Sequence, residues 1–170
     1  DQILTQASRW NYMFNKKSIC NANFRVQIGR QWGNGPQHTA NYHSIFAQSL
    51  GLEIFIPATP EEAFYQIKYM NKLNKPCVML EHRYLSQISQ KFNLKNKNYK
   101  VDTYKFFKEK KKTKNELVTY ADTFYDAIFA REYLRKFNLD IAILNLSYFP
   151  SDKRVSDKVF KILSKYEFNI

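Results

Sequence analysis

The chain has 170 residues, of which 44% are hydrophobic and 16% are aromatic, and its formal net charge is +12 at pH 7. This length and composition allow one ordinary domain or two incomplete ones with a hydrophobic core, and they exclude a disordered chain. The apolar runs are shorter than the ~20 residues that cross a bilayer, so we expect no membrane span and, from the start at Asp1, no signal peptide.

The positive charge would attract polyanions, but lysine is spread over every segment instead of forming one stripe. We interpret it as a solvated surface bias and do not expect a nucleic-acid partner, although a basic nucleic-acid binder stays open as a third class of function. Cys20 and Cys77 are the only cysteines, and they show no Cys-x-x-Cys spacing. This pattern predicts no zinc site and a reducing compartment, either the cytoplasm or an organelle matrix.

The first predicted elements are a helix and a strand. Apolar residues recur at helical spacing over residues 2–14, which predicts an amphipathic helix. Residues 24–28 alternate like a strand with one buried face, and Gly29 interrupts the pattern. The glycines of the chain all lie between residues 29 and 51; they are Gly29, Gly33, Gly35 and Gly51. Turns that need backbone angles unfavourable for other residues should therefore concentrate in this segment.

A regular alternation of strands and helices follows. Residues 41–50 predict a short helix with Gly51 at its C-cap, and residues 52–57 form a compact apolar strand. Thr59-Pro60-Glu61-Glu62 is a good helix opening, because Thr caps, Pro fits the first turn and the carboxylates complement the helix dipole. With the buried strand at residues 76–80, the alternation predicts an α/β fold with a parallel sheet.

The second half of the chain repeats this pattern after a polar interval. Residues 83–115 are rich in Lys, Asn, Gln and Ser and are interpreted as a basic linker. A strand is expected at residues 116–120, a helix at 123–137, a strand at 141–146, and a last helix from Ser151-Asp152 that carries Val155, Val159, Phe160 and Leu163. The sequence therefore divides into residues 1–82, the linker 83–115 and residues 116–170.

The candidate site is the segment Gly33-Asn34-Gly35-Pro36-Gln37-His38, which joins a strand to a helix, the place where open α/β sheets put ligand contacts. The two glycines let the backbone approach a ligand, Pro36 stiffens the turn, and a histidine can exchange a proton near neutral pH. From these residues alone, a tight turn whose histidine only bonds the backbone stays equally open.

Other conspicuous residues receive structural interpretations. His43 lies about one helical turn beyond the histidine of this segment, but no Cys or carboxylate completes a metal-binding set, so we expect a surface or helix-start histidine and no metal. Glu81, beside His82, is given a structural role. Trp10 and Trp32 are expected to anchor the core or an interface.

Five blocks of the sequence follow one another in an order and spacing that resemble a known family. They are Asp1-Gln2-Ile3, Gly35-Pro36-Gln37-His38-Thr39, Gly51-Leu52-Glu53-Ile54, Pro57-Ala58-Thr59-Pro60-Glu61-Glu62-Ala63 and Lys75-Pro76-Cys77-Val78-Met79-Leu80-Glu81. The family is the β-subunit of thiamine-diphosphate-dependent 2-oxo-acid dehydrogenases, such as pyruvate dehydrogenase. A weaker similarity places residues 116–170 at the opening of the transketolase C-terminal domain.

The resemblance implies a fold, a site and partners. Residues 1–82 would be the second half of a pyrimidine-binding domain. His38 would contact the 2-oxo acid or its thiamine adduct during decarboxylation or acyl transfer, with Gly35, Pro36 and Gln37 in the substrate-channel turn. Thiamine diphosphate with Mg²⁺ would be held mainly by an α-subunit. The other implied partners are a second β-subunit and a lipoyl-bearing acyltransferase.

Departures from the family pattern keep other functions open. The family's cofactor-activating glutamate lies upstream of the residues that match Asp1, so this chain alone is expected to be inactive. Leu73 and Lys75 stand where relatives have a monovalent-cation loop, and Ser147-Tyr148-Phe149 stands where they have an arginine. The chain is therefore either part of a β-subunit or a diverged inactive relative. The alternatives are a non-catalytic transketolase-like interaction subunit, or another thiamine enzyme such as transketolase or deoxyxylulose-phosphate synthase.

Overall fold

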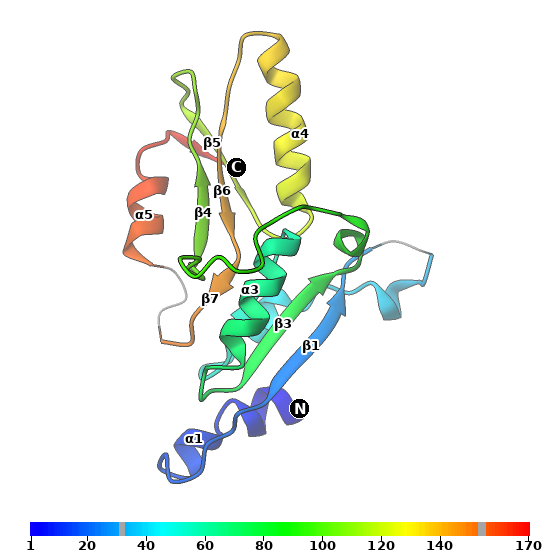
Figure 1. Ribbon diagram of the computed structural model, residues 1–170, viewed down its shortest axis with the longest axis vertical. Coiled ribbons are helices and arrows are strands. Elements are labelled where there is room, and N and C mark those ends of the chain that lie inside the picture. Colours follow the sequence, from blue (N-terminus) through cyan, green and yellow to red (C-terminus); the bar gives the residue numbers. More distant parts are fainter. Residues whose placement is uncertain (31–32, 153–155) are drawn as a thin grey trace.

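The computed structural model describes residues 1–30, 33–152 and 156–170 and arranges them around two four-stranded sheets (Figure 1). The strand order is β1-β3-β2-β7 in the first sheet and β4-β6-β5-β8 in the second sheet. Helices lie on the faces of both sheets. The predicted α/β class is confirmed, while Trp32 and Val155, for which the sequence suggested roles, lie outside the described residues.

The first sheet is parallel except at one edge. Strands β1 (Asn23–Ile28), β3 (Cys77–His82) and β2 (Glu53–Phe55) run in the same direction, and β7 (Tyr148–Phe149) pairs antiparallel with β2. The central strand β3 is buried on both faces, as expected for the continuous apolar run at its start. The carboxyl ends of β1, β2 and β3 therefore meet at one edge of the sheet.

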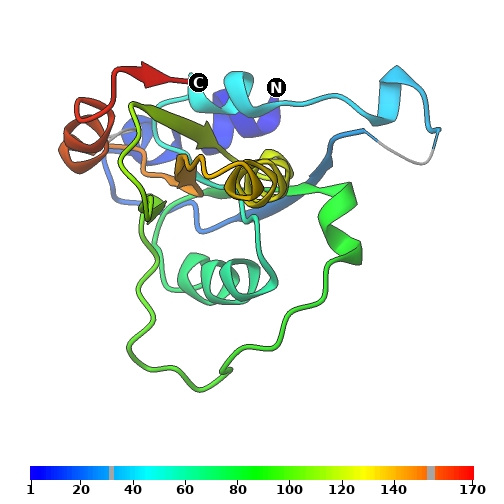
Figure 2. The same ribbon diagram turned by 90° about the horizontal axis from the view of Figure 1, so that it is seen from above.

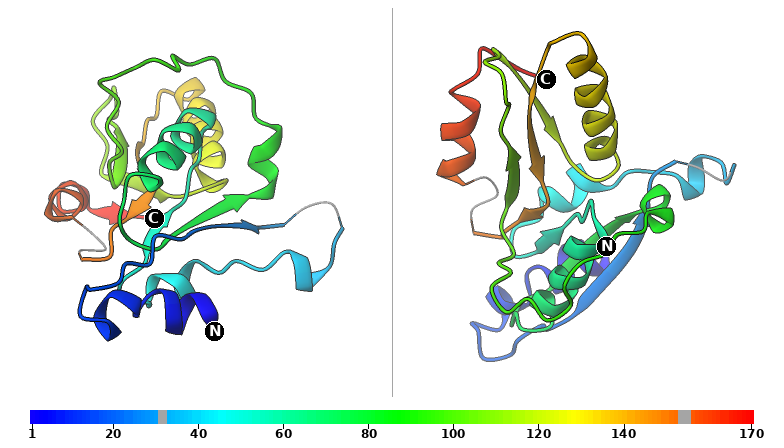
Figure 3. Two further views of the ribbon diagram at one scale, coloured as in Figure 1. Left: turned by 60° about the horizontal axis from the view of Figure 1, so that its bottom comes forward. Right: turned by 45° about the horizontal axis from the view of Figure 1, so that its top comes forward.

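Helix α3 (Pro60–Met70) covers one face of this sheet, and the N-terminal segments cover the other (Figure 3). The predicted opening of α3 is confirmed as a capping box: the Thr59 hydroxyl accepts from the Glu62 amide, and the Glu62 carboxylate accepts from the Thr59 amide. On the opposite face, helix α2 (His43–Ala47) buries Phe46 against the sheet.

The N-terminal helix is shorter and more broken than the apolar spacing predicts. Residues 2–14 form a π-helical segment η1 (Gln2–Ala7) and a one-turn helix α1 (Trp10–Met13). The Ser8 hydroxyl donates to the carbonyl of Leu4, a bond that competes with regular helix geometry and bends the chain. The expectation of one continuous helix was therefore wrong.

The second sheet is covered on both faces. Its strands are β4 (Tyr104–Phe107), β6 (Ala142–Leu146), β5 (Asn115–Thr119) and β8 (Phe168–Asn169). Helix α4 (Thr123–Lys136) packs on the side of Ile143, and helix α5 (Asp157–Leu163) packs on the side of Leu144, as Figure 1 shows. These adjacent residues of β6 point to opposite faces because side chains alternate along a strand.

The segment 83–115 is more than a linker. It contains a 3-10 helix η3 (Arg83–Gln87) and the strand β4, which pairs antiparallel with β6. The basic linker expected there thus includes a strand of the second sheet, whose Tyr104, Phe106 and Phe107 pack against the two cores of that sheet. Between these elements the chain passes around α3, and Tyr99 stacks on Tyr65 of that helix (Figure 2).

Where the two sheets meet, residues from the turns of one sheet pack in the core of the other. Ala58, from the turn after β2, lies in the core under α4, and Ala121, from the turn between β5 and α4, is fully buried in the core of the first sheet. Strand β7 also comes from the C-terminal part of the chain but belongs to the first sheet. The division into domains at residues 82 and 115 stays a prediction. Among the described helices, none combines the length and apolar character that a bilayer span requires.

Candidate functional site

The predicted turn joins β1 to α2 as the sequence indicates. After β1 ends, Gly35 adopts a left-handed φ of +70° and caps the 3-10 helix η2 (Pro36–His38), with Pro36 at its first position. The Gly35 carbonyl accepts the Thr39 hydroxyl at 2.8 Å and the His38 amide at 3.3 Å. Local chemistry thus forms a tight turn that presents the side chains of Gln37 and His38.

This turn projects away from both sheets, beyond the carboxyl end of β1 (Figure 2). Gln37 and His38 are exposed, and no side-chain hydrogen bond or ion pair of His38 occurs within the described part of the chain. The imidazole is therefore not packed inward beneath neighbouring side chains. It is available to a molecule outside this chain.

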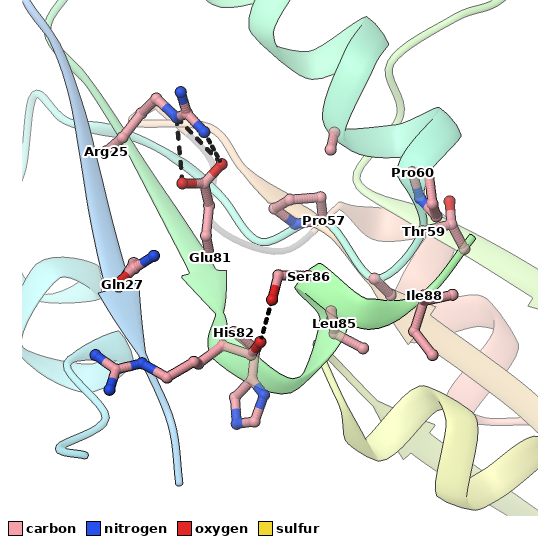
Figure 4. Close-up of a pocket in the computed structure, with 13 residues that line it drawn as sticks. Arg25, Gln27, Pro57, Thr59, Pro60, Glu81, His82, Leu85, Ser86 and Ile88 are labelled. Atoms are coloured by element: carbon pink, nitrogen blue, oxygen red, sulfur yellow. Dashed lines mark hydrogen bonds and ion pairs between the residues drawn. The ribbon is translucent and has the colours of Figure 1, made fainter. Parts of the chain in front are cut away.

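Residues of β1 and β3, of η3 and of the start of α3 line a cavity of about 350 Å³ (Figure 4). Its lining includes Arg25 and Glu81 from the neighbouring strands β1 and β3. Their side chains form an ion pair with three hydrogen bonds, the shortest from Arg25 Nη2 to Glu81 Oε1 at 2.8 Å. The hydrogen bonds that Arg25 donates to Glu81, together with the charge of that carboxylate, raise the pKa of Arg25. Since the Arg25 side chain is 61% exposed, the pair contributes little to stability. This pairing fits the structural role expected for Glu81.

The sequence analysis assigned no role to His82. It ends β3 and is only 5% exposed, and its Nε2 atom lies 3.4 Å from Oδ2 of Asp122 at the start of α4. A second cavity of about 200 Å³ adjoins this contact and is also lined by Arg30, Tyr84 and Asp126. Burial lowers the pKa of His82, Asp122 opposes this effect and Arg30 reinforces it. Forty positions of sequence separate the two partners, so no local motif could reveal them.

His43 begins α2, as a helix-start histidine should, but it is half-buried and not a surface residue. Its ring meets the ring of Tyr120 edge-on, with centroids 4.8 Å apart. Burial lowers the pKa of His43, with a smaller lowering from His82 and an opposing effect from Asp122. Within the described residues, no group of three or more His, Cys, Asp or Glu side chains could hold a metal ion.

Lys75, expected from the sequence to depart from the family's monovalent-cation loop, places an ammonium group here. Lys75 Nζ lies 2.7 Å from Oε1 of the buried Glu53, which also accepts from Tyr148 and Ser151. Burial alone would raise the pKa of Glu53, but the bonds from Lys75, Ser151 and Tyr148 outweigh it and lower the pKa. The positive charge at this place thus comes from the chain itself.

Comparison with known proteins places these features in context, although no family model matches the chain. The mitochondrial β-subunit of the pyruvate dehydrogenase E1 component of Saccharomyces cerevisiae is 25% identical over 166 residues, which are 95% of this chain and 45% of the relative. The corresponding subunit of Staphylococcus epidermidis is 25% identical over 146 residues, or 86% of this chain and 45% of the relative. The β-subunit of acetoin:2,6-dichlorophenolindophenol oxidoreductase from Cupriavidus necator is 28% identical over 85 residues, or 50% of this chain and 25% of the relative.

Solved structures show the same fold. Transketolase from Campylobacter jejuni superposes with a TM-score of 0.61 at 17% identity, covering 86% of this chain and 23% of the enzyme. A split-gene transketolase, described as an inactive β4 tetramer, gives 0.58 at 13% identity, covering 84% of this chain and 46% of that one. The chain thus spans less than half the length of these relatives. The resemblance inferred from the sequence is confirmed: the chain is similar in sequence to the β-subunits of pyruvate dehydrogenase and of acetoin:2,6-dichlorophenolindophenol oxidoreductase, and its fold is transketolase-like.

Proposed function

We propose that the chain serves as part of the β-component of a thiamine-diphosphate-dependent 2-oxo-acid dehydrogenase and takes part in oxidative decarboxylation together with an α-subunit. The observation that carries the proposal is the projecting turn Gly35-Pro36-Gln37-His38, whose exposed histidine can enter a site on another polypeptide. The similarity to pyruvate dehydrogenase β-subunits supports it.

The residues of this turn fit a role at the substrate end of the cofactor. The imidazole of His38 is uncommitted within the described chain, so its nitrogens are free to hold or move a proton on a bound 2-oxo acid. Gly35 keeps the backbone accessible, and Pro36 limits the freedom of the turn. Bound thiamine would supply the carbanion chemistry. We assign the diphosphate and Mg²⁺ to the α-subunit.

The proposal requires an assembly. Besides the α-subunit, a second β-subunit and a lipoyl-bearing acyltransferase are the partners that the family implies, in the cytoplasm or in an organelle matrix. Helix α4 and its C-terminal end expose large apolar side chains. They are Phe129, Tyr133 and Phe137, with exposed fractions of 62%, 60% and 62%. Such side chains along one helix are typical of a surface that a subunit covers.

The test uses the chain co-expressed with the α-subunit and with any coding sequence that precedes Asp1. We expect the assembled complex to decarboxylate a 2-oxo acid, and we expect His38→Ala to lower kcat by about 10²- to 10⁴-fold, the usual loss when a general acid or base is removed. Asn41→Ala, at an exposed position of the same segment, is the matched control. A complex that decarboxylates none of the common 2-oxo acids would contradict the proposal.

A non-catalytic transketolase-like interaction subunit is the second candidate. The observation that favours it is the isolation of the His38 imidazole, because an acid or base catalyst is usually oriented by a hydrogen-bonded neighbour, and the described residues provide none. The same variant separates the two functions. An unchanged rate of the assembled complex with His38→Ala would favour the non-catalytic role.

A further inference from the structure

The turn with His38 lies in a long segment, residues 30–42, which leaves the first sheet at Gly29 and returns at His43, where α2 begins. The segment has few contacts of its own, since most of its described residues are exposed. The position of His38 therefore depends on how the two ends of the segment are held. Both ends reach the same small group of side chains.

At the outgoing end, the backbone of Gly29 lies directly against the imidazole of His82. A Cβ atom added to Gly29, whose φ is +89°, would lie 1.9 Å from His82 Nε2. Ile28, the preceding residue, is fully buried and is the register partner of His82 across β1 and β3. The imidazole thus packs on the point where the segment departs, and only glycine leaves room for it.

At the returning end, the turn between β5 and α4 makes the contact. Tyr120 packs edge-on against His43, and Ala121, fully buried with a φ of +50°, fixes this turn in the core of the first sheet. Asp122, the next residue, reaches His82 across the junction of the two sheets. A single turn of the second sheet therefore contacts His43 at the returning end and His82, which packs on Gly29 at the outgoing end.

We infer that His82 and Asp122 are positioning residues, which join the two sheets into a latch that holds both ends of residues 30–42 and so fixes the place of the His38 turn. The catalytic meaning of this latch rests on the proposed function, but its mechanical effect does not.

The charges around His82 agree with an orienting contact. Its Nδ1 atom has no hydrogen-bond partner among the described residues, so the approach of Nε2 to Asp122 is the polar contact that sets the ring. The titratable and charged groups that surround it are Arg30 after β1, His43 on α2, Tyr84 on η3, and Asp122 and Asp126 on α4. The contact of Nε2 with the Asp122 carboxylate, 3.4 Å away, is thus the one that faces an opposite charge when the ring is protonated.

The experiment measures the spread of distances between spin labels on the whole chain. One label replaces Gln37, next to an intact His38, and the other replaces Lys68, an exposed residue of α3. Cys20→Ser removes the more accessible native thiol, while Cys77 is buried. We expect Asp122→Asn to broaden the Gln37 to Lys68 distance distribution roughly twofold, because the ends of the segment gain freedom. Asp126→Asn, which removes an equal charge one turn along α4, should leave the distribution unchanged.

A second label pair controls for a general loss of rigidity of the whole chain. Labels at Lys68 and at Glu132, an exposed residue of α4, report the relation of the two sheets and should keep their distribution. If Asp122→Asn unfolds the chain, His82→Asn, which retains a polar group, provides the same comparison. Equal distributions in these variants and in the wild type, or equal broadening of both label pairs, would overturn the latch. Because no activity is measured, failure of the dehydrogenase proposal, read from His38→Ala, remains distinguishable.

Discussion

Replacing Gly29 by alanine probes the tightest backbone contact of the candidate site. The new methyl group would lie 1.9 Å from Nε2 and 2.1 Å from Cδ2 of His82, so the ring or the strand must move. The ring is buried, and Gly29 directly follows Ile28, the last residue of β1 that pairs with β3, so neither the ring nor the backbone moves freely. The substitution therefore combines backbone strain with overpacking.

The two contributions have separate magnitudes. A left-handed backbone costs a residue other than glycine roughly 1–2 kcal/mol, and overpacking a well-packed interior costs about 1–3 kcal/mol. We expect Gly29→Ala to lower the free energy of unfolding by about 3 kcal/mol, which for a chain of this size lowers Tm by roughly 6–12 °C. Urea denaturation followed by circular dichroism measures the first quantity, and a thermal scan measures the second.

A matched control isolates the steric contribution. Gly33 also has a positive φ, +65°, but no atom lies within 4 Å of its added Cβ, so Gly33→Ala should cost only the backbone strain. In the double variant Gly29→Ala/His82→Ala the imidazole is absent, and the steric cost should largely disappear as a coupling of about 1–2 kcal/mol. If Gly29→Ala is no more destabilising than Gly33→Ala, or if its effect simply adds to that of His82→Ala, the proposed packing of His82 on this backbone is wrong.

Three further predictions concern the second sheet and α3. Asp140, 9% exposed, accepts from Arg131 and Arg135, which helps to lower its pKa despite burial. Asp140→Asn should therefore cost about 3–5 kcal/mol near neutral pH, and the wild-type advantage in urea melts should fade as acid protonates the carboxylate. Burial raises the pKa of Glu116 to about 7, and both of its carboxylate oxygens are unpartnered among the described residues. Stability should consequently fall as pH rises from the unfolded pKa to about 7, by up to about 3 kcal/mol, and a Glu116→Gln variant that shows the same fall would contradict this assignment. Thr59→Ala removes the cap of α3 and should cost about 1 kcal/mol, whereas Thr113→Ala, outside any helix, should cost little; equal costs in denaturant melts would refute the capping role.

Local signals in the sequence were sufficient for much of the fold. Four consecutive residues, Thr59-Pro60-Glu61-Glu62, determine where α3 begins, and the buried start of β3 is a continuous apolar run. Both depend on neighbours in the chain, so their chemistry is visible without the structure. The strand–turn–helix context of His38 was predicted for the same reason, while its catalytic role stays a prediction.

Features that depend on distant partners were missed. Strand β4 lies in a lysine-rich segment and forms because its aromatic residues pack against β6, which begins 35 residues after β4 ends. The contact of His82 with Asp122 crosses from one sheet to the other. In neither case does the local pattern contain the partner, since period and composition report only on neighbours along the chain. The N-terminal helix is a different kind of miss: the apolar spacing of residues 2–14 is helical, but the structure divides them between η1 and α1.

The contact between the sheets gives the second sheet a part in positioning the His38 segment, although its own residues show no sign of this in the sequence. None of its strands carries the proposed catalytic histidine, yet the turn Tyr120–Asp122 holds the base of the segment that does. The side chain of Ala121 is fully buried in the first core, so this turn cannot shift without disturbing the sheet from which the segment departs. Because packed interiors respond to small displacements, changes in the second sheet that move α4 should alter the placement of His38 even though they lie far from it in the sequence.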